Sequence, residues 1–414
     1  MARIIVGVTG GIAAYKACQV IRNLREADGG AHDVTVVPTE NALKFVGRAT
    51  FEALSGNPVT TSVFEMVDEV RHVWLGQHAD LVVVVPATAD FLARLTAGRS
   101  DDLLAATCLT TTAPIVVAPA MHTEMWRNPA TVANVATLRE RGITVLEPAS
   151  GRLTGKDSGP GRLPEAEQIV QMALARLEGA TFHHTLAGVR VVVTAGGTHE
   201  AIDPVRFIGN SSSGRQGFAL AEMAAQMGAE VTVIAAHTHS DRVPLATTRI
   251  NVSSARELRE ATLSAAADAD VVIMAAAVAD YRPESEATAK LKKGVNDDSL
   301  SQLRLVRNPD ILADLVAARA EGTIHPQVIA GFAAETGDSE HTPLQLGQEK
   351  ILRKGCDLLM VNEVGKDKVF GQTTNGGWLI EPSGTFTPVP VASKYQVADV
   401  ILGRVSGLLD NLRS

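Results

Sequence analysis

The chain contains one arrangement twice: an apolar run that leads directly into a glycine turn and then into a helical pattern. Residues 3–8 precede Thr9-Gly10-Gly11, and residues 189–194 precede Ala195-Gly196-Gly197. A short apolar run closed by glycines predicts a buried strand with a tight turn after it. Further apolar runs alternate with helical patterns after each opening. The sequence therefore predicts an α/β protein with two parallel sheets, each covered by helices on both faces.

The spacing of these runs predicts the element order and a domain boundary. In the first half we expect strands at 3–8, 34–37, 81–85, 115–118 and 143–146, and helices at 12–27, 101–109 and 129–141. In the second half we expect strands at 189–194, 230–235, 271–275, 327–331 and 357–361, and a last helix at 393–409. Periodicity is lost over residues 176–188, which we interpret as a linker. The predicted domains are residues 1–181 and 182–414.

Length, charge and cysteine content restrict the class of protein. A chain of 414 residues suits two domains better than one core. The net charge is −8, and the chain has neither a long basic block nor an apolar run of membrane-spanning length, so we expect no nucleic-acid or membrane partner. The amino terminus runs straight into a strand rather than a signal peptide, and Cys18, Cys108 and Cys356 form no disulfide or metal pattern. We expect a cytoplasmic protein.

Three turns of the first domain follow predicted strands and indicate a shared pocket. They are Thr9–Ala14, Val85–Asp90 and Ala118–His122. In open α/β sheets, ligands bind beyond the carboxyl ends of the strands, where glycines and free helix amides favour a phosphate. The glycine turn alone is equally consistent with a simple connection. Two histidines, His72 and His78, are candidates for proton transfer, and the pattern alone does not choose between them.

The second domain carries polar clusters at the corresponding places. The segment Asp203–Gly217 combines Arg206, Asn210 and three serines before a predicted helix, which suits a phosphate or carboxylate. Asp280 ends the stretch of small residues after the strand at 271–275, where it could bind a ribose hydroxyl or a base edge. A lysine cluster begins at Lys290, although such clusters are more often solvated surface. Asn308–Ile311, Gly331–Thr336 and the pair Lys350 and Lys354, one helical turn apart, complete the set.

The motifs of the first domain resemble the phosphopantothenoylcysteine decarboxylase family of flavoproteins. They are GVTGGIAAYK (7–16), the His72 segment, PATAD (86–90), PAMH (119–122) and the stretch 150–162. The resemblance implies a flavodoxin-like or Rossmann-like trimer with FMN between subunits. The flavin oxidises the cysteinyl end of the substrate, carboxylate is lost, and the ene-thiol is reduced back. By the same resemblance, the residues that hold FMN are Gly10, Gly11, Ile12, Ala13, Thr39, Pro86, Ala87 and Thr88.

The resemblance also assigns the reacting residues of this domain and shows two departures. His72 matches the active-site histidine of the family, whereas His78 does not. His122 occupies the position of an asparagine that contacts the substrate carboxylate, and it can still donate a hydrogen bond. Gly155 occupies the position of a flap cysteine that completes the reductive half-reaction. Another group or water must then supply that proton, or the reaction stops at the oxidised product. Arg94 and Asp101 lie in matching stretches and receive no role.

The second domain resembles the phosphopantothenate–cysteine ligase family along its whole length, in a Rossmann-like fold. DPVRFIGNSSSG, AAAVADYR, KLKKG, NPDI and GFAAET occur in order. The resemblance implies a dimer that uses CTP and Mg²⁺ to join 4′-phosphopantothenate to L-cysteine through an acyl-cytidylate. Asn210 would hold that intermediate, and Lys290 would neutralise the charge of departing pyrophosphate. The nucleotide would be bound by Ala275, Ala276, Asp280, Lys290, Asn308, Pro309, Asp310, Ile311, Phe332, Lys350 and Lys354, and the substrate by Arg206, Asn210, Ser212, Ser213 and Gly214.

Two other readings explain less of the sequence. A pair of dinucleotide-binding oxidoreductase domains would need Gly-x-Gly-x-x-Gly, which neither glycine turn has. A flavin-binding regulatory protein is consistent with Gly155 and His122 but leaves the ligase motifs unexplained. His237 and His239 lack further ligands, so we expect no protein metal site and Mg²⁺ only with the triphosphate. We therefore expect a bifunctional enzyme of coenzyme A biosynthesis. A trimeric first domain and a dimeric second domain together predict a closed homo-oligomer such as a dodecamer.

Overall fold

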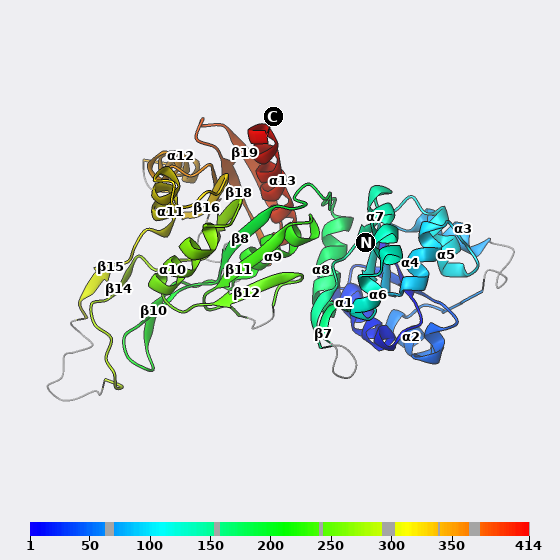
Figure 1. Ribbon diagram of the computed structural model, residues 1–414. Helices are drawn as coiled ribbons and strands as arrows, with labels where there is room; N and C mark the ends of the chain where they lie inside the picture. Colours follow the sequence, from blue (N-terminus) through cyan, green and yellow to red (C-terminus); the bar gives the residue numbers. More distant parts are fainter. Residues whose placement is uncertain are drawn as a thin grey trace. The chain divides into compact units, whose positions relative to one another are not determined.

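The computed structural model describes residues 1–62, 70–152, 158–239, 243–291, 303–337, 340–363 and 373–413. These residues form two compact units, Met1–His183 and His184–Ser414, shown in Figure 1. Each unit contains its own sheet with helices on both faces, which confirms the expected α/β class. Below, the units are called the front unit and the rear unit.

The front unit is built on a five-stranded parallel sheet. Its order is β2-β1-β3-β4-β5, with β1 Arg3–Val8, β2 Asp33–Pro38, β3 Leu81–Ala87, β4 Ile115–Pro119 and β5 Thr144–Val145. This is the flavodoxin-like order, in which the sheet changes direction between β1 and β3. All seven residues of β3 are buried. The continuous apolar runs of the sequence thus belong to strands that are covered on both faces.

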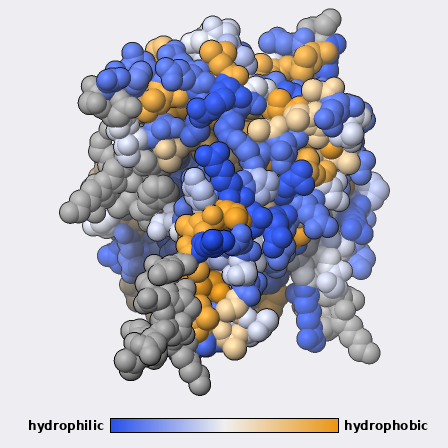
Figure 2. Space-filling model, turned by 90° about the vertical axis from the view of Figure 1, so that its left-hand side faces the viewer, coloured by the Kyte–Doolittle hydropathy of each residue, from blue (hydrophilic) through white to orange (hydrophobic). Residues whose placement is uncertain are grey.

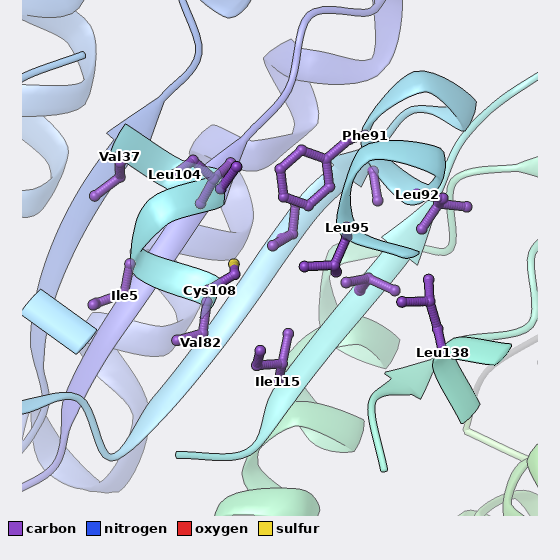
Figure 3. Close-up of a cluster of buried hydrophobic side chains, with 14 of the residues drawn as sticks. Ile5, Val37, Val82, Phe91, Leu92, Leu95, Leu104, Cys108, Ile115 and Leu138 are labelled. Carbon is purple, nitrogen blue, oxygen red and sulfur yellow. The ribbon is translucent and has the colours of Figure 1, made fainter. Parts of the chain in front are cut away.

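Helices cover both faces of the front sheet. On one face, α3 Arg71–His78, α4 Ala89–Thr96, α5 Leu103–Thr110 and α7 Pro129–Glu140 pack on the strands. Figure 3 shows this cluster, with Phe91 and Leu95 from α4 and Leu104 and Cys108 from α5. On the other face lie α1 Ala17–Glu26 and α8 Ala166–Leu177. The expected helix at 12–27 begins as a 3₁₀ turn, η1 Ile12–Lys16, and becomes α-helical at Ala17. The remaining pieces are η2 Ala27–Gly29, η3 Ala42–Lys44, α2 Arg48–Ser55, α6 Thr123–Trp126 and the hairpin β6 Ala149–Arg152 with β7 Ser158–Arg162.

The rear sheet has eight strands in the order β12-β11-β8-β13-β16-β17-β18-β19. Their bounds are β8 Arg190–Ala195, β11 Glu230–Ala235, β12 Thr247–Asn251, β13 Val271–Met274, β16 Val328–Glu335, β17 Leu358–Glu363, β18 Thr374–Ile380 and β19 Phe386–Ser393. The first six are parallel and, counted along the chain, follow the 3-2-1-4-5-6 order of Rossmann sheets. β18 and β19 add an antiparallel edge that the sequence analysis did not anticipate.

The helices of the rear unit are divided between the two faces of its sheet. α10 Ala255–Ala266, α11 Ile311–Ala320 and α12 Pro343–Lys354 share one core with the strands. α9 Arg215–Gln226 and the last helix, α13 Lys394–Arg413, pack against each other on the other face. At Gly217 an added Cβ would lie 2.6 Å from the Cβ of Ala195, so glycine allows α9 to approach β8 closely. Two small hairpins, β9 His199–Ala201 with β10 Phe207–Gly209 and β14 Tyr281–Pro283 with β15 Leu305–Arg307, stand outside the sheet.

The surface is mainly hydrophilic on the face shown in Figure 2. Hydrophobic side chains there form separate small groups among hydrophilic ones. Within the described ranges, no helix is both long and apolar enough to cross a membrane.

Candidate functional site

Loops and helix starts of the rear unit converge at one edge of its sheet. The carboxyl ends of β8, β13, β16 and β17 lie at this edge, because these strands are parallel. β18 is antiparallel to β17 and therefore begins there, while β19 ends there and leads into α13. A cavity of about 1080 Å³ lies at this edge. The volume is sufficient for a nucleotide-sized ligand together with part of a second substrate.

Most of the rear residues singled out by sequence line this cavity. They come from five segments of the chain, namely the loop before α9, the residues after β13, the start of α11, strand β16 and the end of α12. The lining includes Asn210, Ser212, Ser213, Gly214, Ala275, Ala276, Asp280, Asn308, Pro309, Asp310, Ile311, Phe332, Lys350 and Lys354. The fold thus brings together residues that the sequence placed only after separate strands.

Hydrogen bonds hold the polar groups of the cavity wall in place. The side-chain amide of Asn210 donates to the carbonyl of Val278 at 3.0 Å. That of Asn308 donates to the carbonyl of Ala279 at 2.8 Å, and the backbone amide of Asn308 donates to the carbonyl of Asp280 at 2.8 Å. The loop after β13 is therefore tied to the segments before α9 and α11. Its carboxylate, Asp280, is exposed and faces solvent in the cavity.

The two lysines of α12 are paired with carboxylates. Lys350 Nζ lies 2.8 Å from Glu335 Oε1, and Lys354 forms an ion pair with Asp310. Asp310 also caps α11, since its Oδ1 accepts a hydrogen bond from the Ala313 amide at 3.2 Å. Burial opposes ionisation of Asp310, but the hydrogen bond from Lys354 prevails and lowers the pKa of that carboxyl. The two carboxylates thus offset part of the positive charge that the lysines bring to the cavity.

Arg206 and Lys290 do not line the cavity among the described residues. Arg206 Nη1 pairs with Asp203 Oδ2 at 3.1 Å, and its Nη2 donates to the carbonyl of Leu291 at 3.3 Å. Asp203 is buried, and its Oδ2 also accepts from the Leu291 amide at 3.2 Å. Burial raises the pKa of Asp203, but hydrogen bonds from the Val205, Leu291 and Arg206 amides outweigh burial and lower it. Arg206 thus holds the backbone next to the exposed Lys290.

Several polar residues of the cavity were not predicted as site residues, and four of them lie close together. Arg215 and Gln216 begin α9, Asn375 lies on β18, and Lys394 begins α13. Gln216 links the last two, because its side chain accepts from Asn375 Nδ2 at 2.9 Å and donates to the Lys394 carbonyl at 3.1 Å. Burial, and secondarily the charge of Arg215, lowers the pKa of Lys394 to about 8. Arg215 and Gln216 lie inside the segment Asp203–Gly217 but were given no role. Asn375 and Lys394 carry no local motif, because they reach the cavity through the antiparallel strands β18 and β19.

A second candidate site lies where the front sheet changes direction. The Thr9 hydroxyl donates to the Pro86 carbonyl at 2.7 Å and accepts from the Thr88 amide at 3.1 Å, which fastens the glycine turn to the end of β3. An added Cβ at Gly10 would lie 2.5 Å from the Cβ of Asn41, so this turn requires glycine. Gly11 begins η1 without a side-chain cap, and the first amides of a helix have no intrahelical partner. The turn therefore offers backbone donors to an anion.

The other front candidates lie around this sheet edge and on α3. Thr39 is buried after β2, and its hydroxyl accepts from the Ala42 amide at 3.3 Å. Ile12 beside the glycine turn is 74% exposed, which is unusual for such an apolar side chain. His122 directly precedes α6, and the backbone amide of the adjacent Met121 donates to the Gly161 carbonyl at 2.9 Å. His72 lies on helix α3 rather than in a loop, and its buried Nδ1 has no hydrogen-bond partner among the described residues.

The two cysteines of the front unit lie in environments that do not favour a reactive thiol. Gly155 itself lies outside the described residues. Cys108 is buried in the cluster of Figure 3, and burial raises the pKa of its thiol to about 12. Cys18 is half-buried on α1, and burial also raises its pKa. Neither environment is that of an accessible, reactive thiol.

The described residues contain no group of three or more His, Cys, Asp or Glu side chains arranged to hold a metal ion. His237 stacks on His199 with ring centroids 3.6 Å apart, and its Nε2 lies 2.9 Å from the Ser253 hydroxyl. Burial and the charge of His237 lower the pKa of His199. These histidines belong to a stacked surface cluster.

Comparisons with known proteins match both units. The flavoprotein family model matches residues 1–178, and the model of the DNA/pantothenate metabolism flavoprotein C-terminal domain matches residues 186–408. The chain is 56% identical to the coenzyme A biosynthesis bifunctional protein CoaBC of Mycolicibacterium smegmatis, over 98% of each chain. It is also 56% identical to the protein of that name from Mycobacterium tuberculosis, over 97% of this chain and 96% of the relative. A crystal structure of the C-terminal domain of a CoaBC protein is 32% identical, with a TM-score of 0.45, and covers 55% of this chain and 99% of that one.

Proposed function

Because the chain belongs to the family of bifunctional coenzyme A biosynthesis proteins, we propose that it catalyses two consecutive steps of that pathway. The rear unit ligates 4′-phosphopantothenate to L-cysteine at the expense of CTP. The front unit decarboxylates the product, 4′-phosphopantothenoylcysteine, to 4′-phosphopantetheine with FMN. The ligase product is the decarboxylase substrate, so one chain holds both members of a sequence.

The observation that carries the ligase proposal is the composition of the rear cavity. Asn210, Asp280, Asn308 and Lys350 come from four separate segments and meet around one cavity with room for a nucleotide and part of a second substrate. Carboxylate and amide groups suit a ribose and a base edge, while lysines and the start of α9 suit phosphates. A protein that binds one small substrate does not need separate groups for a base, a ribose and phosphates.

The chemistry explains why a nucleotide is needed. A free carboxylate is a poor acyl donor, so its oxygen attacks the α-phosphorus of CTP and the bond to the pyrophosphate group breaks. The amine of cysteine then attacks the acyl carbon, loses its proton, and CMP departs. We assign Asn210 to holding the acyl-cytidylate. We assign Lys290, whose neighbour Leu291 is anchored to Asp203, to neutralising the charge that develops on pyrophosphate. Mg²⁺ enters with the triphosphate, in keeping with the oxygen-rich coordination that this ion prefers.

The residues around the glycine turn of the front unit fit FMN. The uncapped start of η1 and the Thr88 hydroxyl suit the phosphate, and the exposed Ile12 offers an apolar surface to a flat ring. FMN held there would supply a two-electron oxidation of the cysteinyl end of the substrate and the matching reduction after loss of the carboxylate. The buried, unpartnered Nδ1 of His72 is a polar atom in need of a ligand or of a group from a second copy. We assign proton transfer to His72 and binding of the substrate carboxylate to His122.

We propose a homo-oligomer in the cytoplasm, with trimeric contacts through the front unit and dimeric contacts through the rear unit. Three free cysteines support a reducing compartment. A dodecamer satisfies both symmetries. Its mass in solution, measured by light scattering, tests this arrangement.

The ligase assignment is tested by its first half-reaction. Protein with 4′-phosphopantothenate, Mg²⁺ and CTP, but without cysteine, should form enzyme-bound acyl-cytidylate and release pyrophosphate. A parallel reaction with ATP measures nucleotide preference. Asn210→Ala should release pyrophosphate but lose the intermediate to water, whereas Asp268→Asn, at an exposed position away from the cavity, should behave as wild type. Absence of pyrophosphate release with both nucleotides would refute the ligase assignment.

A further inference from the structure

Lys394 is a buried lysine with no carboxylate partner among the described residues. Only 8% of the residue is exposed, yet it lines the rear cavity. No ion pair joins Lys394 to a carboxylate in the part of the chain that the structure describes. Burial of a charge without a partner is strongly unfavourable, so an unpaired buried lysine in a cavity indicates a missing ligand.

Lys394 is also held in place, which distinguishes it from a side chain left in the core by chance. Its carbonyl accepts from Gln216 Nε2 at 3.1 Å, and the neighbouring Tyr395 hydroxyl donates to Glu222. Glu222 is 1% exposed and also accepts from the Leu245 amide at 3.0 Å. The start of α13 is thus fastened to α9 at Lys394 itself and at the next residue. A rigid support of this kind is expected for a residue that positions a ligand.

The surroundings of Lys394 are positive. Arg215, the first residue of α9, lines the same cavity and is close enough to disfavour the charge on Lys394. α9 starts at Gly214 without a side-chain cap, so its first amides point their partial positive charge toward the same region. Ser212 and Ser213 line the cavity just before it. Two cations, a helix start and two hydroxyls together form a binding site for an anion with several oxygens.

We propose that Lys394, together with Arg215, binds a phosphoryl group of the ligase substrates at the start of α9. The proposal rests on the proposed ligase function and adds to it a positioning residue from the last helix. The phosphoryl group has two possible sources, the phosphates of the nucleotide and the phosphate of 4′-phosphopantothenate. Both present the same chemistry to Lys394, and direct binding separates them.

The test compares Lys394→Met, Lys394→Arg and Arg215→Met with wild type in the full-length protein. Calorimetry measures binding of CTP, 4′-phosphopantothenate and inorganic pyrophosphate, each alone. Lys394→Met should weaken at least one of these ligands by about tenfold or more, and Lys394→Arg should stay within about threefold of wild type. Arg256→Met, at an exposed position on α10, controls for the loss of one positive charge.

The pattern of loss identifies the source. Weaker CTP and pyrophosphate with unchanged 4′-phosphopantothenate assigns Lys394 to the nucleotide, and the opposite pattern assigns it to the acyl substrate. The melting temperature gives an independent readout. Removal of an uncompensated buried charge should leave it unchanged or raise it, whereas a structural lysine would lower it on removal.

The outcome that overturns the proposal is unaltered binding of all three ligands by Lys394→Met. That result leaves the ligase function intact if wild type still forms CMP. Conversely, a wild type that binds pyrophosphate through Lys394 but forms neither CMP nor AMP would refute the ligase and keep the anion site.

Discussion

The carboxylate of Asp203 accepts a hydrogen bond from the backbone amide of Leu291, 88 residues further along the chain. The same oxygen pairs with Arg206, which in turn donates to the Leu291 carbonyl. Both backbone groups of Leu291 are therefore held by one buried ion pair. Because Leu291 follows Lys290 directly, this pair fixes the backbone from which the Lys290 side chain extends.

Asp203→Asn should accordingly impair ligation without loss of the front activity. The variant removes the charge that holds Arg206 and Leu291, and a displacement of about 1 Å at a reacting group can lower turnover by ten- to a hundredfold. Ligase turnover should fall by at least tenfold, while decarboxylation of supplied 4′-phosphopantothenoylcysteine stays within about twofold. Both are measured by mass spectrometry. Asp268→Asn, whose side chain is 90% exposed, is the matched control. Full ligase activity in Asp203→Asn would show that the pair does not position Lys290.

Anion binding at Lys394 should depend on pH near its lowered pKa. In the free protein the pKa is about 8, below the ordinary lysine value, because burial and then Arg215 disfavour the charge. Above pH 8 the free lysine is mostly neutral and must take up a proton before it binds an anion, so affinity should fall as pH rises.

Between pH 7 and pH 9 the wild type should lose about tenfold more affinity than Lys394→Arg, which stays charged. Arg215, the charged group that faces Lys394 from α9, does not titrate in this range. The ligand titrates in the same way in both measurements, so its effect on affinity cancels when the two proteins are compared. Equal pH profiles, measured by calorimetry, would show that Lys394 does not titrate at the bound anion.

The glycine turn of the front unit should tolerate no side chain at Gly10. An alanine Cβ would meet Asn41 at 2.5 Å and displace the turn that fits the cofactor phosphate. Gly10→Ala should therefore purify with much less flavin, seen as reduced visible absorbance relative to protein. Gly47→Ala is the control, because its added Cβ would meet no atom within 4 Å. Ligase activity should be normal in both variants. A full flavin complement in Gly10→Ala would contradict the assignment of this turn.

Cys108 should be dispensable for decarboxylation. Its thiol is buried in the front core, away from the sheet edge, and its pKa is raised to about 12. Cys108→Ala should retain turnover within about twofold and lower the free energy of unfolding by roughly 1–2 kcal/mol, as is usual for a truncated core side chain. Turnover of supplied 4′-phosphopantothenoylcysteine and chemical denaturation measure the two effects. Loss of turnover in a folded variant would identify Cys108 as the replacement for the flap cysteine.

The strands and their carboxyl-terminal motifs could be predicted because burial on both faces leaves a local signal. Apolar runs such as 81–85 and 271–275 are continuous, and the polar residues that follow them are forced to one edge by parallel pairing. The sheet order confirms the α/β fold that these runs predict. The similarity to curated relatives confirms the bifunctional family that the motifs predict. The contribution of each predicted residue to catalysis stays a prediction.

The side of the cavity next to β18 and β19 could not be predicted, since these two strands lack a continuous apolar run. β18 contains two successive glycines, and β19 contains two prolines, so neither has the composition of a strand. Without these strands, nothing in the sequence brings Lys394 near Arg215. The role of Arg206 was obscured in the same way, because one of its partners, Leu291, is distant in sequence and hydrogen-bonds only through its backbone.

The central claim is that one chain performs both steps, and a coupled assay tests it most directly. Purified protein receives 4′-phosphopantothenate, cysteine, Mg²⁺ and CTP, and products are identified by mass spectrometry. Our account predicts accumulation of 4′-phosphopantetheine together with CMP and pyrophosphate. Accumulation of 4′-phosphopantothenoylcysteine alone, or of an oxidised decarboxylated product, would contradict the decarboxylase half of the claim. Absence of all three would contradict the whole.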